Sequence, residues 1–125
     1  MPEGYFKLTR QTGNMGMFAA VRLSVEPAEP PVHITVAESD EIPRFFVPAV
    51  ETGIHIAWDR LLTEGQKPPH TNVAILEIQE TTADTSTIMV VYAAIEAYCN
   101  ALGKSLREPV TISGRQMVFP LGRLR

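Results

Sequence analysis

Hydrophobic and polar residues alternate in three short stretches within the first third of the chain. Residues 6–9 read Phe-Lys-Leu-Thr, and the same period-two pattern recurs over residues 21–26 and 32–36. This alternation is typical of strands with one face in a core and the other towards solvent. Glycines separate the first stretch from the second and prolines separate the second from the third, so the pattern predicts three strands joined by turns.

A helical period begins after the third stretch. Apolar residues between Val50 and Leu61 recur every three or four positions, which predicts a helix with one buried face. Pro48 suits the first turn of this helix, because the N–H that proline lacks would have no helical partner there. Residues 73–78 follow as a strand with apolar side chains on both faces, so we expect this strand to be central or covered.

A second helix is predicted over residues 88–102, where Glu96 is the only charged residue. The three residues before it that can cap its N-terminus are Asp84, Thr85 and Ser86, and Gly103 can end it. We expect one stripe of this helix to face the sheet: Ile88, Tyr92, Ile95, Cys99 and Leu102. Four apolar residues are then left without a core partner, and we interpret them as a candidate oligomer or partner surface: Met89, Val90, Ala93 and Ala97.

A short strand over residues 110–112 completes the order β-β-β-α-β-α-β. Strands grouped first, followed by helices that alternate with single strands, indicate an α+β protein built as an α/β two-layer sandwich. We expect a mixed sheet with two helices on one face, in a single domain over residues 1–125. Residues 113–125 are interpreted as a loose, basic C-terminal end.

Composition narrows the class of protein. The 125 residues suffice for one domain with its own core, and 45% hydrophobic with 20% charged residues is ordinary for a globular protein. No apolar run approaches the roughly 20 residues that span a bilayer, and the N-terminus has no signal-peptide pattern. Cys99 is the only cysteine, which excludes an intrachain disulfide and favours a cytoplasmic location. The net charge of −3 argues against general nucleic-acid binding.

Two phrases carry a family resemblance. The first is Arg-Gln-Thr-Gly at residues 10–13, followed by Gly16 and by a strand that ends in Val-Glu-Pro at residues 25–27. The second is Ile-Pro-Arg-Phe-Phe-Val-Pro-Ala-Val-Glu-Thr-Gly-Ile at residues 42–54. In this order they resemble domain IV of translation elongation factor G and its ribosomal-protection relatives. The resemblance extends over about residues 6–112, and it includes no GTPase domain.

The resemblance implies both a fold and a working end. The fold is that of the ribosomal-protein S-five domain-2-like group, which has a left-handed β-α-β crossover, an exception to the usual hand. In the family, this domain is an arm that reaches the decoding centre and contacts RNA through two tip loops. Carried over to this chain, the candidate tip residues for RNA or partner contact are Arg10, Gly13, Asn14, Met15, Gly16, Thr82, Ala83 and Asp84.

Both tip loops depart from the family pattern. Met15 stands where the family has an arginine. The second loop is about two residues shorter and offers Thr82, Ala83 and Asp84 where the family carries a histidine. The residues nearest to phosphate would therefore be neutral or acidic, which indicates that this tip does not bind RNA in the family's manner.

The chain has no motif that predicts catalysis. The glycine phrase at residues 12–16 lacks the Gly-Lys-Ser/Thr of a P-loop, so we expect no nucleotide bound by this chain alone. His55 shares a helix face with Glu51 and Asp59, where a metal or acid–base site is one interpretation and a solvated polar face is the favoured one. Cys99 lies in an apolar stretch, which indicates a packed thiol. We expect no enzyme activity, catalytic residue, metal or cofactor.

Two functions are consistent with these features. The first is a stand-alone, non-catalytic, translation-related domain that binds the ribosome or a translation GTPase. The alternative is a homo-oligomeric protein-interaction module that kept the fold and lost RNA binding. An enzyme is a third class, supported only by the generality of the fold. No membrane association is expected.

Overall fold

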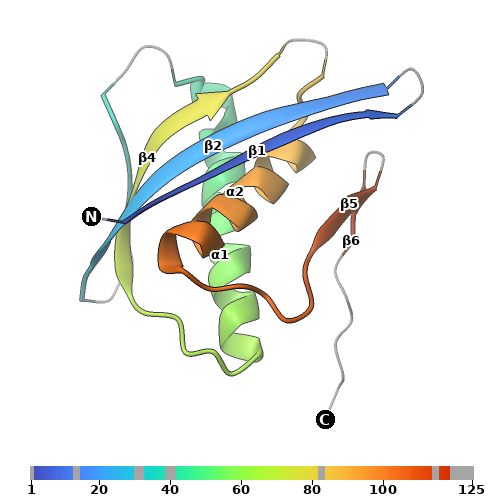
Figure 1. Cartoon of the computed structure of the whole chain (residues 1–125). Coiled ribbons are helices and arrows are strands. Elements are labelled where there is room, and N and C mark those ends of the chain that lie inside the picture. The colour runs from blue at the N-terminus through green and yellow to red at the C-terminus, as the bar shows by residue number, and fades with distance from the viewer. Residues whose placement is uncertain are drawn as a thin grey trace.

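The computed structural model describes residues 2–12, 15–29, 33–38, 42–81, 84–113 and 116–118 (Figure 1). Its main sheet has four strands in the order β1-β2-β4-β3, and a separate two-stranded sheet is formed by β5 and β6. The elements are β1 (Glu3–Thr12), β2 (Met15–Pro27), β3 (Ile34–Val36), the 3-10 helix η1 (Arg44–Phe46), α1 (Val47–Thr63), β4 (Thr71–Gln79), α2 (Thr87–Leu102), β5 (Thr111–Ser113) and β6 (Gln116–Val118).

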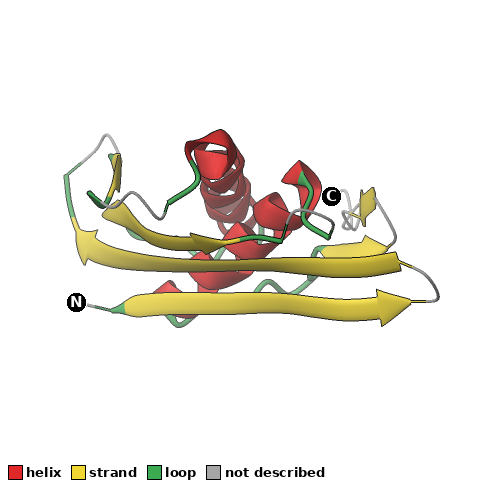
Figure 2. Cartoon of the chain, turned by 90° about the horizontal axis from the view of Figure 1, so that it is seen from above, coloured by secondary structure: helices red, strands yellow, loops and turns green. Residues whose placement is uncertain are grey.

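The predicted α+β two-layer sandwich is confirmed. Both helices lie on one face of the mixed four-stranded sheet, and the view from above shows the two layers (Figure 2). The other face of the sheet has no helix over it among the described residues. Within the same residues, no helix is long and apolar enough to cross a membrane.

Strands β1 and β2 form a long antiparallel ribbon whose register follows the alternation in the sequence. Leu8 lies opposite Ala19 and Phe6 opposite Val21, so these side chains share the face that packs on the helices. Strand β4 pairs with β2 on one side and with the short parallel strand β3 on the other. The strand predicted to be central is therefore central. The parallel strands β3 and β4 are joined through α1, and this is the connection for which the family resemblance implies a left-handed crossover.

The end of the chain differs from the prediction in two respects. The strand expected at residues 110–112 is β5, and it pairs with β6 rather than with the main sheet. Residues 116–118 were expected to belong to a loose end, but they form β6. The sequence of these residues is too short to show a strand pattern by itself, and the pairing with β5 supplies the missing stabilisation.

Close contact between the two helices depends on Gly53 in α1. A Cβ added at this position would lie 2.6 Å from the carbonyl oxygen of Val91 and 2.7 Å from the Cβ of Ala94, both on α2. Glycine is therefore the residue that allows the two helix backbones to approach. Pro48 occupies the first turn of α1, as predicted.

Helix α2 is buried on almost every side, which corrects the predicted oligomer surface. All four residues assigned to that surface are buried within the chain, with exposed fractions of 5% or less: Met89, Val90, Ala93 and Ala97. Of the predicted sheet-facing stripe, Tyr92, Ile95 and Cys99 are buried, and the end residues Ile88 and Leu102 are partly buried against the core.

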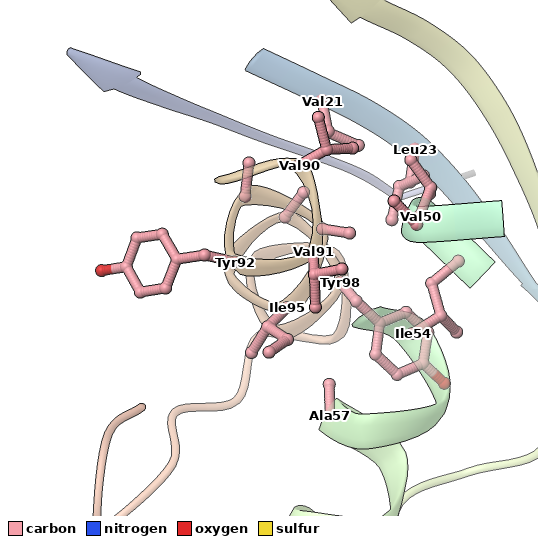
Figure 3. Packing of buried hydrophobic residues seen from close by; sticks show 14 of the residues in the cluster. Val21, Leu23, Val50, Ile54, Ala57, Val90, Val91, Tyr92, Ile95 and Tyr98 are labelled. Carbon is pink, nitrogen blue, oxygen red and sulfur yellow. The ribbon is translucent and has the colours of Figure 1, made fainter. Parts of the chain in front are cut away.

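Helix α2 is buried so deeply because small residues on the side away from the predicted stripe let it approach the sheet. A Cβ at Gly4 of β1 would clash with the backbone of Ala97 and Ala101, so these alanines bring α2 directly onto the sheet. Figure 3 shows Tyr98 pointing towards Ile54 of α1, while Tyr92 points to the other side of the helix. The sheet, α1 and the C-terminal segment thus enclose α2, for which the sequence predicted core partners on one side only.

A carboxylate fixes the start of the C-terminal segment to the end of α1. Glu64 accepts hydrogen bonds from the backbone N–H groups of Arg107 (2.7 Å) and Glu108 (3.1 Å). The Gln66 amide donates to Glu64 Oε1 and to the carbonyl oxygen of Ser105, both at 2.8 Å. Burial raises the pKa of the Glu64 carboxyl, but these hydrogen bonds outweigh that effect and leave the pKa below its ordinary value.

Candidate functional site

The two segments predicted as tip loops meet at one end of the sheet. The N–H of Phe18, near the start of β2, donates to the carbonyl oxygen of Asp84 at 3.1 Å. The hydroxyl of Thr85 donates to the carbonyl oxygen of Phe18 at 2.7 Å. The segment between β4 and α2 therefore continues along the edge of β2 after β4 itself has ended.

Gly16 and Asp84 are in direct contact, which joins one candidate residue of the first loop to one of the second. A Cβ at Gly16 would lie 2.8 Å from the Cγ and from both carboxylate oxygens of Asp84. The carboxylate thus covers the glycine. Of the other candidates, Gly13, Asn14, Thr82 and Ala83 lie outside the described residues, and Met15 is described only as the first residue of β2.

Threonines hold the second loop in shape. The N–H of Thr81 donates to the Thr85 hydroxyl at 2.8 Å, and the N–H of Asp84 donates to the Thr81 hydroxyl at 3.3 Å. Thr85 and Asp84 were predicted as helix caps, but here they bond within the loop and to β2. Ser86 is the residue at the N-cap of α2, and its side chain makes no capping hydrogen bond within the described part of the chain.

Arg10 has a structural partner. Its guanidinium donates to the carbonyl oxygen of Ile112 at 2.9 Å, which joins β1 to β5. It also lies near Tyr92 of α2: burial and the charge of Glu96 raise the pKa of that phenol, and the charge of Arg10 partly opposes them. The one arginine among the candidate tip residues therefore ties the C-terminal hairpin to the sheet.

Two cations on the open face of the sheet, Lys7 and Arg22, are also engaged. Lys7 Nζ lies 5.6 Å from the centre of the Phe18 ring. Arg22 lies 4.5 Å above the Tyr5 ring and forms ion pairs of 3.7 Å with Glu3 and with Glu77. Such contacts hold these cations against the sheet, and Asp84 places a carboxylate at the described part of the tip.

Sequence reasoning missed Phe18 and Thr81, which hold the two loops together. A signal for Phe18 exists in the sequence, because it falls on the outward face of the strand that follows Gly16. Thr81 and Thr85 are four residues apart, the spacing of a local turn, but threonines are too common near helix starts for this to have been decisive.

The other titratable groups do not assemble into a reactive site. No group of three His, Cys, Asp or Glu side chains suited to a metal ion occurs in the described part of the chain. His55 and Asp59 are exposed on α1, and His70 lies beside the Trp58 ring, with 5.6 Å between ring centres. Cys99 is buried, and burial together with the charges of Glu96 and Glu64 raises the pKa of its thiol to about 12.

The geometry defines a class: a two-layer α+β domain whose hairpin and β4–α2 loop form one tip, the domain IV-like fold of elongation factor G. No protein-family model matches the chain. Elongation factor G 1 of Syntrophomonas wolfei subsp. wolfei (strain DSM 2245B / Goettingen) is 32% identical over 111 residues, which is 86% of this chain. The resemblance to elongation factor G is therefore confirmed, although the chain spans only 16% of the length of this relative.

A solved structure supports the same fold. A crystal structure of a protein from Thermus thermophilus matches 82% of this chain and 16% of its own chain, with a TM-score of 0.66 and 23% sequence identity. At this identity the likeness concerns the fold alone. The sequence similarity to elongation factor G supports a translation-related domain, and the solved structure supports its fold.

Proposed function

We propose that the chain acts as a stand-alone, non-catalytic domain in the cytoplasm, where it docks on the ribosome or on a translation GTPase. The observation that carries this proposal is the meeting of the hairpin and the β4–α2 loop through Gly16, Phe18 and Asp84, in a chain that resembles elongation factor G over 86% of its length. A tip shaped in this way suits insertion into a site on a larger particle.

The chemistry of the tip supports docking through contacts that differ from those of the family. Asp84 places a carboxylate over Gly16, and Arg10 is bonded to Ile112. A carboxylate repels phosphate, so the tip favours protein groups or base edges over the RNA backbone. Binding should accordingly depend less on salt than phosphate contacts would make it.

Co-sedimentation with purified ribosomes over a salt series tests the proposal. The chain is expected in the ribosomal pellet at low salt. Met15→Arg, which introduces the arginine of the family, should raise the pelleted fraction and steepen its salt dependence. Thr52→Arg on the exposed side of α1 adds the same charge away from the tip and is the matched control. Absence of the chain from the pellet at low salt, with and without Met15→Arg, would contradict ribosome docking.

The alternative, a homo-oligomeric protein-interaction module, is favoured by a different observation. Phe45 of η1 is 79% exposed and Leu62 of α1 is 50% exposed, although both are large and apolar. Self-association through apolar side chains would have to use such residues, because the α2 residues first considered are buried. Light scattering at increasing concentration tests this alternative: a monomer throughout would remove it, and a dimer lost in Phe45→Ser would support it.

A further inference from the structure

Strand β1 forms a long free edge of the main sheet. It is the first strand in the order β1-β2-β4-β3, so β2 is its only partner among the described strands, and Figure 2 shows it as the outermost strand, beside the N label. The opposite edge strand, β3, has three residues, whereas β1 has ten. Because a long uncovered edge strand is a template for pairing with another chain, β1 is the edge at which such pairing is expected.

The register of β1 with β2 decides which backbone groups point outwards. The N–H of Val25 donates to the carbonyl oxygen of Pro2, so even-numbered residues of β1 bond to β2. The odd-numbered residues consequently direct their N–H and C=O groups away from β2. Burial agrees with this assignment, because Leu8 is 2% exposed whereas its neighbours Lys7 and Thr9 are exposed residues.

The free part of this edge has a limit at each end. The carbonyl oxygen of Tyr5 accepts a hydrogen bond of 3.0 Å from the side-chain amide of Asn100 on α2, and β1 ends one residue after Gln11. Between these limits, the outward backbone groups belong to Lys7, Thr9 and Gln11. None of these groups has a backbone hydrogen-bond partner within the described part of the chain. The free positions are therefore centred on Thr9.

We propose that a second copy of this chain pairs with the β1 edge in antiparallel orientation, about a two-fold axis through Thr9. Thr9 then lies opposite Thr9 of the second copy, and Lys7 lies opposite Gln11 on either side of the axis. Each of these pairs exchanges two backbone hydrogen bonds, so every free group is used. The free segment is symmetric about Thr9, as a contact between identical surfaces requires, and directly opposed threonines form a favourable cross-strand pair.

The charges favour this register over an axis through Lys7. That axis would set two lysines directly opposite each other, and it would need the carbonyl oxygen of Tyr5 that Asn100 already occupies. With the axis through Thr9, the two lysines lie about 14 Å apart along the strands. A lysine often protects an edge strand from pairing, but the Lys7 ammonium lies 5.6 Å from the centre of the Phe18 ring on β2, away from the edge.

This inference deepens the homo-oligomeric alternative, on which it rests, by assigning the interface to main-chain groups of β1, and it does not require the ribosome. Light scattering on the full chain should show a dimer that forms as concentration rises. The amides of Lys7, Thr9 and Gln11 should exchange hydrogen more slowly in the dimer. The amide of Leu8 bonds to β2 in both states and is the internal control. A monomer at every concentration, or a dimer without protection at Thr9, would overturn the proposal.

Charge variants at the axis test the register. Thr9→Lys and Thr9→Glu each place like charges opposite each other and should raise the dissociation constant of the dimer by roughly two- to fivefold. An equimolar mixture of the two variants pairs opposite charges and should restore association. Thr35→Lys and Thr35→Glu make the same changes at an exposed residue of β3, on the other edge, and should leave association unchanged. A mixture that associates no better than either variant alone would refute the axis through Thr9.

A proline variant separates this interface from the one that uses Phe45. Thr9→Pro removes an N–H that β2 does not use, so it should give a folded monomer, with cooperative urea unfolding followed through Trp58. Phe45→Ser should leave the β1 dimer intact. A dimer that is lost in Phe45→Ser and kept in Thr9→Pro would overturn the β1 interface and leave the homo-oligomeric alternative standing.

Discussion

Replacement of Gly53 by alanine tests the packing of the two helices on which the fold depends. The added Cβ would meet the carbonyl oxygen of Val91 at 2.6 Å and the Cβ of Ala94 at 2.7 Å. An ordinary van der Waals contact between such atoms is about 3.5–4.0 Å. The first of these neighbours is a backbone atom in the middle of α2, so relief requires the helices to separate rather than a side chain to rotate.

The expected change in the free energy of unfolding on Gly53→Ala is the sum of two opposed effects. Alanine is favoured over glycine inside a helix by about 1 kcal/mol. Overpacking of a close contact typically lowers the free energy of unfolding by about 1–3 kcal/mol, and the rigid backbone partner places Gly53→Ala at the upper end. The net expectation is a loss of about 2 kcal/mol in the free energy of unfolding.

Urea denaturation followed by the fluorescence of Trp58, the only tryptophan, measures this loss. Thr52→Ala is the matched control, because Thr52 is the exposed neighbour of Gly53 on the same helix and should change stability by less than about 0.5 kcal/mol. A Gly53→Ala variant as stable as the wild type, or more stable, would refute the close approach of α1 and α2.

Three further predictions concern other parts of the molecule. Gly16→Ala should destabilise the chain, and Asp84→Ala should remove most of that effect, as a double-mutant cycle by urea denaturation will show. The Glu64 pKa is depressed in the folded chain, so its contribution is fully present above the ordinary value of 4.5 and is lost as pH falls through the folded value. Glu64→Gln should therefore be less stable at pH 7 by about 1 kcal/mol, and acid unfolding curves of the two proteins should converge. Cys99 should resist thiol reagents near neutral pH until urea unfolds the chain, since its pKa is about 12.

Much of the fold could be predicted because local pattern and tertiary structure agree. Alternation located β1 and β2, and apolar residues on both faces of residues 73–78 identified the central strand. The faces of α2 could not be predicted, because a helix apolar on every side has no preferred orientation in its sequence alone. The decisive contacts are backbone approaches at Gly4 and Gly53, which depend on residues far away in the chain.

The candidate site was predicted as two separate loops, and the structure joins them through Phe18, Asp84 and Thr85. The resemblance located the loops, but only the hydrogen bonds of Phe18 with Asp84 and Thr85 show that they touch. The role of Arg10 could not be predicted from the sequence. Because it belongs to the Arg-Gln-Thr-Gly motif of elongation factor G, it was a candidate for RNA or partner contact. Its hydrogen bond to the carbonyl oxygen of Ile112 instead gives it a structural role.

Binding to ribosomes at low salt tests the central claim most directly. The wild-type chain is centrifuged with purified ribosomes through a sucrose cushion, and its fraction in the pellet is measured against a ribosome-free control. Docking predicts that the chain enters the pellet in a saturable manner, and that its pelleted fraction depends less on salt than that of Met15→Arg. A chain that stays in the supernatant at the lowest salt and at every ribosome concentration would contradict the claim.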